Sequence, residues 1–372
     1  MSLELDLLDE EYSSVGNDID TPSLQLSNEI SRSIRSGNLP PSVNNWTTKH
    51  AELLNIYYEK ECINDPLDVL ERISTLQPFS REQHHFTDSL KSSLQFNASY
   101  KTFDETYNFY TAIENGMKKE LEDTICKVNK NPEHDRFIKF KVSRFLKCLH
   151  RFMVDMESLR KNYEEYKGNF KHLLVSFVEM CCMEVLECSD TSQSVWRNLQ
   201  GTKAVVSKPD LCLYKSGLED FVLLEEEVVI PVTEVKLSPE PSQMRSKEIN
   251  SSLDPACTSD KVKPQIELDF NEDILGQHAG TLLLDLDRYC LKKTVYIDDD
   301  YVMRMPGIMF KGTQVLFTLL EMNRSHHRKL RYSEDLDNEK DLATITYSRP
   351  LDILVEKDRC TLIESFIRLN NI

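Results

Sequence analysis

The spacing of apolar residues changes near residue 160, and this change constrains the fold more than any other feature of the sequence. From about 46 to 160, apolar residues recur every three or four positions, which predicts helices in segments such as WTTKHAELLNIYYEKE and TYNFYTAIENGMKKELEDTICKV. After about 163, a predicted helix in NFKHLLVSFVEMCCMEVLE is followed by short β-like runs, TKAVV, DLCLY, DFVLLEEEVVI and VTEVKL. The sequence therefore predicts a helical N-terminal extension and then an α/β domain.

The rest of the chain completes this α/β pattern. A polar stretch from Ser238 to about Asp269 has no clear periodicity, so we expect a long loop or insertion at about 238–270. We then predict a helix in DILGQHAGTLLLDLDRYCLKK, a strand-turn-strand in PGIMFKGTQVLFTLLEM with its turn at Lys311-Gly312, and a final helix in PLDILVEKDRCTLIESFIRL. The predicted division is an acidic disordered tail over 1–40, a helical region over 41–160, and a mixed-sheet domain over 161–372.

Composition narrows the class of protein. A chain of 372 residues is long enough for two compact units. It has no apolar run near the roughly 20 residues that span a bilayer, so we expect no membrane partner. Its start, MSLELDLLDEEYSS, is acidic where a secretory signal would be basic and then apolar, which predicts a nuclear or cytoplasmic protein. Ten cysteines are scattered without a CxxC pair, as expected of reduced thiols that act as small apolar residues.

The net charge of −17 argues against a protein that coats nucleic acid non-specifically, although it leaves room for a local basic groove. The tail contributes eight acidic residues against Arg32 and Arg35, and it either keeps the chain soluble or docks a partner. The predicted helix after 135 is basic instead: Arg136, Arg144, Lys147 and Arg151 gather beside the apolar stripe of Ile138, Val142, Phe145, Leu149 and Phe152. This basic face is either simply solvated or contacts a phosphate backbone.

Two further features carry weaker signals. The basic cluster RSHHRKLR, from Arg324 to Arg331, is either an ordinary solvated loop or a contact to nucleic acid. The adjacent pairs His84-His85 and His326-His327 are poor chelates, because neighbouring side chains on a strand or helix point apart.

Three polar residues in the strand region suggest a metal-dependent centre. Asp210 follows Pro209 at the start of a predicted strand, and Glu234 and Lys236 alternate on a later strand, so the latter two project from one face. Phosphodiester cleavage needs a hard divalent cation held by oxygen ligands. Asp210 and Glu234 suit that role, and Lys236 suits orientation or deprotonation of the attacking water. Spacing alone favours a plainer explanation, because ExK triplets are common on exposed strands and a Pro-Asp dipeptide often just begins a strand or turn.

The order of these elements, KPDLCLY, a strand ending in TEVK, the helix with LGQHAGTLLLDL and then GIMFKGTQVLFTLLEM, resembles the PD-(D/E)XK nuclease-like superfamily over about 200 residues. The resemblance implies a mixed central sheet flanked by helices, a restriction-endonuclease-like core, and Mg²⁺- or Mn²⁺-dependent cleavage of DNA or RNA. Gln277 matches a glutamine that many members carry on the helix after the ExK strand. Members often also use a glutamate of the first helix, for which Glu184 and Glu179 are both candidates.

Two departures from this family keep a rival hypothesis open. The connection between the ExK strand and the helix with Gln277 is longer than is usual in the family, and loops of such length are often functional or disordered. Many members have also lost cleavage while keeping the fold. The rival is a catalytically silent domain that binds nucleic acid, or a protein partner through the helical region or the acidic tail. A helical scaffold without any nuclease-like core is a third possibility, which requires the strand signals to be misread.

Overall fold

The computed structural model describes residues 39–73, 77–98, 100–103, 109–112, 115–132, 136–158, 163–187, 194–215, 229–234, 263–290 and 301–371. The predicted acidic tail over 1–40 lies outside these ranges, except for Leu39 and Pro40. Most of the predicted insertion at 238–270 also lies outside them.

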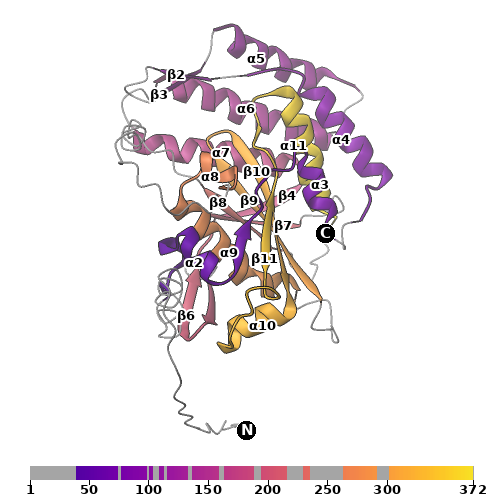
Figure 1. Cartoon of the computed structure of the whole chain (residues 1–372). Coiled ribbons are helices and arrows are strands. Elements are labelled where there is room, and N and C mark those ends of the chain that lie inside the picture. Colours follow the sequence, from indigo (N-terminus) through magenta and orange to yellow (C-terminus); the bar gives the residue numbers. More distant parts are fainter. Residues whose placement is uncertain are drawn as a thin grey trace, which may run out of the picture.

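A mixed eight-stranded sheet forms the centre of the described part (Figure 1). Its order is β1-β11-β10-β9-β8-β7-β4, and β12 pairs with β10 as well. Pairing is parallel for β1–β11 and for β8–β9 and antiparallel elsewhere. The strands are β1 (Ile56–Tyr58), β4 (Met183–Glu187), β7 (Leu211–Lys215), β8 (Val229–Glu234), β9 (Val302–Lys311), β10 (Gln314–Asn323), β11 (Ala343–Tyr347) and β12 (Leu351–Asp352). The predicted fold class, a mixed central sheet flanked by helices, is confirmed.

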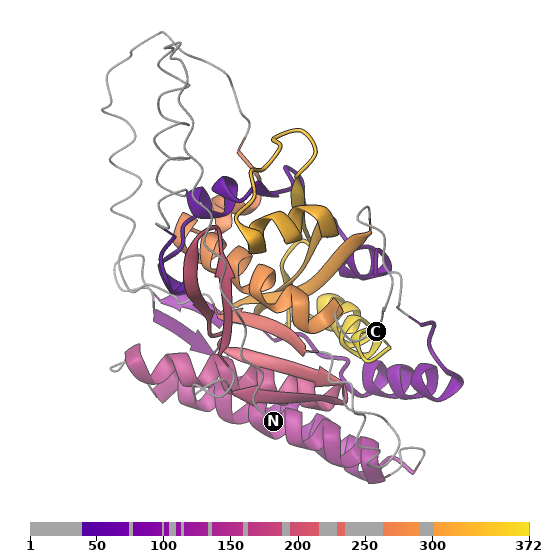
Figure 2. The same cartoon turned by 90° about the horizontal axis from the view of Figure 1, so that it is seen from below.

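One face of the sheet is covered by a thick helical layer, whose long helices run along the lower edge of Figure 2. Along β10, Val315, Phe317 and Leu319 point into this layer, as alternation along a strand requires. The layer contains α3 (Pro66–Glu71), α4 (Arg81–Ser93), α5 (Asn115–Lys130), α6 (Arg136–Ser158), α7 (Tyr163–Met180) and α11 (Glu356–Leu369).

The opposite face is covered mainly by α9 (Glu272–Cys290). The N-terminal segment, with η1 (Val43–Asn45) and α2 (Thr48–Leu53), packs on the outer side of α9. The same side holds α8 (Ile266–Asp269), α10 (Arg324–Tyr332) and the separate hairpin of β5 (Val195–Leu199) and β6 (Thr202–Ser207). A second small hairpin pairs β2 (Tyr100–Phe103) with β3 (Phe109–Ala112).

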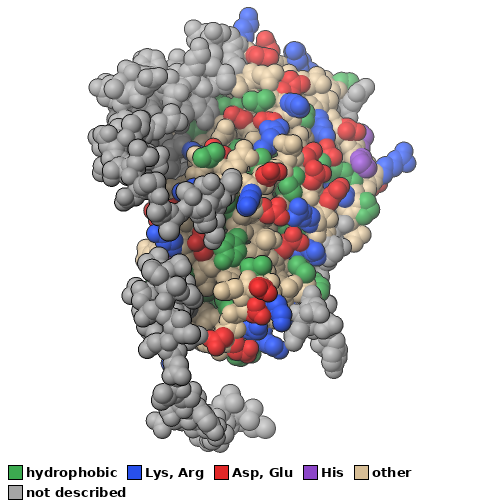
Figure 3. All heavy atoms as spheres, viewed as in Figure 1, with side chains coloured by type: hydrophobic (Ala, Val, Ile, Leu, Met, Phe, Trp, Pro, Cys, Tyr) green, Lys and Arg blue, Asp and Glu red, His purple; other side chains and the backbone are tan. Residues whose placement is uncertain are grey.

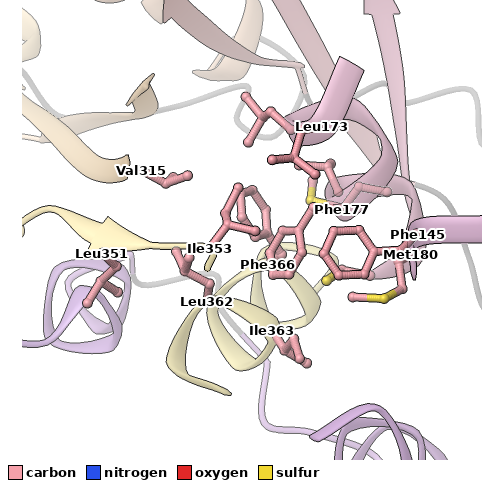
Figure 4. Close-up of a cluster of buried hydrophobic side chains, with 14 of the residues drawn as sticks. Phe145, Leu173, Phe177, Met180, Val315, Leu351, Ile353, Leu362, Ile363 and Phe366 are labelled. Carbon is pink, nitrogen blue, oxygen red and sulfur yellow. The ribbon is translucent and has the colours of Figure 1, made fainter. Parts of the chain in front are cut away.

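A chain of aromatic rings joins the helical layer to the sheet. The ring centroid of Phe317 in β10 lies 5.3 Å from that of Phe366 in α11. The centroid of Phe366 lies 5.9 Å from that of Phe177 in α7. Phe177 in turn lies 5.3 Å from Phe145 of α6 (Figure 4). All four rings are buried, so residues of the predicted helical region and of the predicted α/β domain share one hydrophobic core.

Several local predictions are confirmed. The apolar stripe of α6 is buried, Asp65 caps α3 by accepting from the Leu67 N–H at 2.9 Å, and the turn between β9 and β10 falls at Lys311-Gly312. Gly312 has a φ of 63°, a left-handed conformation that glycine adopts without strain.

Other predicted boundaries are wrong. The helix predicted through Glu187 ends at Met180, because Cys182 has a φ of 61° and Asn370 donates to the carbonyls of Cys181 and Cys182. The residues MEVLE then form β4 at one edge of the sheet. Likewise, the helix predicted from Trp46 ends at Leu53, and the following residues form β1.

Three more corrections concern the strands and the last helices. TKAVV is a strand, as predicted, but β6 pairs with β5 outside the central sheet. RSHHRKLR is a helix, α10, because His326 and Leu330 bury one of its faces. The polar stretch predicted as a loop up to Asp269 ends in α8, where Ile266 is buried and its N–H donates to the Tyr347 hydroxyl. The final helix begins only at Glu356, after β12.

Candidate active site

Asp210 lies at the point where the β5–β6 hairpin returns to the central sheet. Its N–H donates to the carbonyl of Val232 in β8 at 3.1 Å, and Leu211, the next residue, is the register partner of Val232. Asp210 thus lies just before the first residue of β7 that pairs with β8. Asp210 is half-buried there, after the buried Pro209.

Glu234 is the last described residue of β8, two positions after Val232. Its backbone pairs with Phe310 of the parallel strand β9. Neighbouring strands lie about 4.8 Å apart and rise about 3.3 Å per residue, so the backbones of Asp210 and Glu234 are roughly 6–8 Å apart. The side chain of Glu234 and the whole of Lys236 lie outside the described part of the chain.

A buried histidine fixes α9 against the sheet at this level. His278 is fully buried between Thr233 of β8, at 2.8 Å from its Nδ1, and Thr318 of β10, at 2.8 Å from its Nε2. Burial lowers the pKa of His278 to about 3, so the ring is neutral at pH 7. Since Thr233 immediately precedes Glu234, the contact with His278 fixes the position of α9 along β8, close to the end of that strand.

Gln277 therefore lies level with the end of the ExK strand. Its side chain is half-buried, and its Nε2 donates to the Oδ1 of Asn44 in η1 at 3.3 Å. Asn44 belongs to the N-terminal segment that also contacts β6, because the N–H of Val206 donates to the Pro41 carbonyl. Sequence reasoning missed Asn44, since only a long-range contact places it beside Gln277 and no local pattern marks it.

Two glycines let the N-terminal segment lie so close to α9. A Cβ on Gly276 would lie 2.2 Å from the carbonyl carbon of Thr47, and a Cβ on Gly280 would lie 2.7 Å from the Trp46 ring. The Trp46 ring is fully buried over Gly280. The contact between Asn44 and Gln277 thus depends on the absence of a Cβ at Gly276 and Gly280.

The structure does not bring the two candidate first-helix glutamates to Asp210. Glu179 is the penultimate residue of α7, and its carboxylate lies 2.8 Å from the Arg144 guanidinium of α6. Glu184 faces Tyr214 in the sheet, three residue pairs from the Glu187–Leu211 pair that lies next to Asp210. That offset amounts to roughly 10 Å along the strand.

Glu187 is the glutamate of β4 that lies nearest to Asp210 in the register of the sheet. It is the register partner of Leu211, and its carboxylate pairs with Lys171 of α7 at 2.9 Å. Sequence reasoning missed it because MEVLE was assigned to the end of a helix, whereas its alternating pattern was the signal for a strand.

No group of three or more His, Cys, Asp or Glu side chains in the described ranges lies close enough together to hold a metal ion. Cys62, Cys126, Cys148, Cys181, Cys182, Cys212 and Cys360 are free thiols. Burial raises the pKa of Cys182 to about 11. His326 is buried with its Nε2 2.9 Å from the Leu54 carbonyl, which explains its place in the fold without a ligand.

Compared with known proteins, the chain matches no family model and no curated protein. None of the helices in the described ranges has the length and apolar character needed to cross a membrane.

Proposed function

We propose that this protein hydrolyses phosphodiester bonds of nucleic acid at a magnesium-dependent centre formed by Asp210, Glu234 and Lys236, on a PD-(D/E)XK nuclease-like core. The observation that carries the proposal is the hydrogen bond from Asp210 to Val232. It holds the backbone of Asp210 beside β8, so the backbones of Asp210 and Glu234, which are far apart in the sequence, lie at the ends of neighbouring strands.

The order of elements supports the same proposal. Helix α7 is followed by β4, β7 and β8, which pair as an antiparallel meander, and then by α9 and by β9, which is parallel to β8. With the β5–β6 hairpin inserted between β4 and β7, this series resembles the helix, three strands, helix and strand expected of the superfamily core. The sheet extends further through β10, β11 and β1.

Each residue would contribute a distinct part of the chemistry. Carboxylate oxygens of Asp210 and Glu234 are the hard ligands that Mg²⁺ or Mn²⁺ prefers. When bound, such an ion polarises the phosphoryl group and lowers the pKa of an attacking water. Lys236 would orient or deprotonate that water and offset the charge that develops on the phosphate. Gln277 would position water or substrate from α9.

The test is cleavage of labelled single- and double-stranded DNA and RNA by the full chain with Mg²⁺ or Mn²⁺. We expect Asp210→Asn and Lys236→Ala to lower kcat by about 10²–10³, the effect of losing roughly 3–4 kcal/mol of transition-state stabilisation. Glu184→Gln is the matched control, because it removes one acid from the same edge of the sheet, roughly 10 Å from the proposed centre. Its kcat should be unchanged.

Two results would contradict the proposal. If the wild-type protein cleaves none of the four substrates with either metal, the silent interaction domain becomes the better hypothesis. If it cleaves but Asp210→Asn cleaves equally well, the activity belongs to another site. One observation favours the silent domain. The Gln277 side chain, which is expected to contact substrate, is already hydrogen-bonded to Asn44.

A further inference from the structure

Helix α6 presents a solvent-facing stripe that no part of the proposed centre uses. Its apolar residues face the core, with Val142, Phe145 and Leu149 fully buried. On the opposite side of the helix, spaced by three or four residues, lie the exposed residues of what we call the α6 stripe: Arg136, Phe137, Phe140, Arg144, Lys147 and Arg151.

The charge of this helix contrasts with that of the chain. Residues 136–151 contain six Lys or Arg and no Asp or Glu, in a protein of net charge −17. On the face drawn in Figure 3, by contrast, acidic and basic side chains are interspersed over the described surface. A continuous basic run of this kind raises the local potential felt by a polyanion.

The charges of the α6 stripe are only partly neutralised. Arg144 pairs with Glu179 at 2.8 Å, and Arg151 pairs with Asp155 at 3.5 Å. Arg136 and Lys147 make no ion pair within the part of the chain that the structure describes. Of the acids on the flanking helices, Glu122 of α5 pairs instead with His150.

Two phenylalanines lie among these charges. The side chain of Phe140 is 62% exposed and that of Phe137 is 43% exposed, although Phe137 also contacts Phe86 of α4 at 5.9 Å. A large exposed aromatic ring costs solubility and contributes nothing to the core, so its position between cations points to a ligand that has both charge and flat apolar faces.

We infer that the α6 stripe binds single-stranded nucleic acid, with its cations on the phosphates and Phe140 stacked on a base. Single strands combine a charged backbone with unpaired base faces, and aromatic rings in basic tracks bind them by stacking. A duplex offers the phosphates but hides the base faces. A membrane surface fits less well, because the apolar face of α6 is already buried in the core and cannot enter a bilayer.

The Arg151 end of α6 is the end of this helix nearer to the candidate active site. Its Arg136 end lies beside the C-terminus of α7, since Arg144 contacts Glu179. Its Arg151 end lies beside the N-terminal half of α7, where Phe152 contacts Phe170 at 5.2 Å. The next residue of α7, Lys171, pairs with Glu187 at the edge of the candidate site. The inference thus deepens the proposed function, on which its link to cleavage rests, by naming a single-stranded substrate.

The experiment measures binding without cleavage. Fluorescence anisotropy of labelled single-stranded DNA, single-stranded RNA and duplex DNA of equal length is followed with the full chain in EDTA. We expect single strands to bind tighter than the duplex, and Phe140→Ala to weaken single-strand binding about tenfold. Arg136→Gln with Lys147→Gln should reduce the slope of log Kd against log salt by about 1.4, since each phosphate contact contributes about 0.7.

The matched control is Lys203→Gln with Lys340→Gln, which removes the same charge from exposed positions elsewhere. This pair should leave the salt slope unchanged. Equal effects of the two double variants, unchanged binding in Phe140→Ala, or no binding by the wild type would each overturn the inference.

The same proteins separate this inference from the proposed cleavage. If Asp210→Asn binds single strands normally and the wild type cleaves nothing, the binding role of the α6 stripe is supported and the proposed nuclease activity is refuted. If the wild type cleaves but the α6 variants have the wild-type Kd and KM, the nuclease activity is supported and the binding role of the α6 stripe is refuted.

Discussion

Replacing Gly276 by alanine should loosen the N-terminal segment from α9. The added Cβ would lie 2.2 Å from the carbonyl carbon of Thr47 and 2.4 Å from its Cα, and both are backbone atoms that cannot rotate away. Either α9 or the N-terminal segment must therefore move. Asn44 would then move away from Gln277.

The size of the effect follows from comparison with a second glycine. Inserting a methyl group into a packed contact costs about 1–3 kcal/mol. Alanine recovers about 1 kcal/mol of helix propensity over glycine. Gly168 in α7 has no atom within 4 Å of its missing Cβ, so Gly168→Ala should give only the gain. Both variants gain the same helix propensity, so their difference reports the steric clash alone. Gly276→Ala should therefore have a free energy of unfolding about 1–3 kcal/mol lower than that of Gly168→Ala.

Urea unfolding followed by circular dichroism measures this difference. Tryptophan fluorescence adds a local reading, because Trp46 is fully buried against α9 whereas Trp196 is 55% exposed. Gly276→Ala should increase the quenching of Trp46 by acrylamide, and a Trp196→Phe background isolates that signal. If Gly276→Ala proves as stable as Gly168→Ala, the segment does not cross α9 at this distance and the reasoning fails.

Two further predictions concern buried polar groups. Arg359 is fully buried, stacks on Phe96 at 4.0 Å and donates to four backbone carbonyls, so Arg359→Met should lower the free energy of unfolding by about 3–5 kcal/mol; an unchanged urea midpoint would contradict this. The pKa of His278 is lowered from 6.5 to about 3, so its unfolded form binds more protons and stability falls as pH drops below about 6.5. The loss is about 2 kcal/mol by pH 5, since each pKa unit is worth about 1.4 kcal/mol. His278→Gln should show a shallower loss between pH 7 and pH 5, and an equal loss would show that another group titrates.

Local patterns predicted those features whose cause lies within a few residues. The buried stripe of α6 follows from apolar spacing, the cap at Asp65 from its own side chain, and the turn at Gly312 from a conformation that favours glycine. The boundaries failed where a distant residue decided them. The end of α7 depends on Cys182, whose neighbouring carbonyls are held by Asn370 from the other end of the chain.

For the candidate site, the sequence selected Asp210, Glu234 and Lys236 by residue type and strand position, and the family resemblance added Gln277. Only the tertiary structure decided that Glu187 lies beside Asp210 while Glu184 does not, since the register of β4 against β7 determines which residues are neighbours. Tertiary structure alone also brought Asn44 to Gln277, across 233 positions of sequence. A sequence shows which residue types are present and therefore which chemistry they could perform. Contacts between residues far apart in the sequence depend on how whole helices and strands pack, and no short stretch of sequence determines that packing.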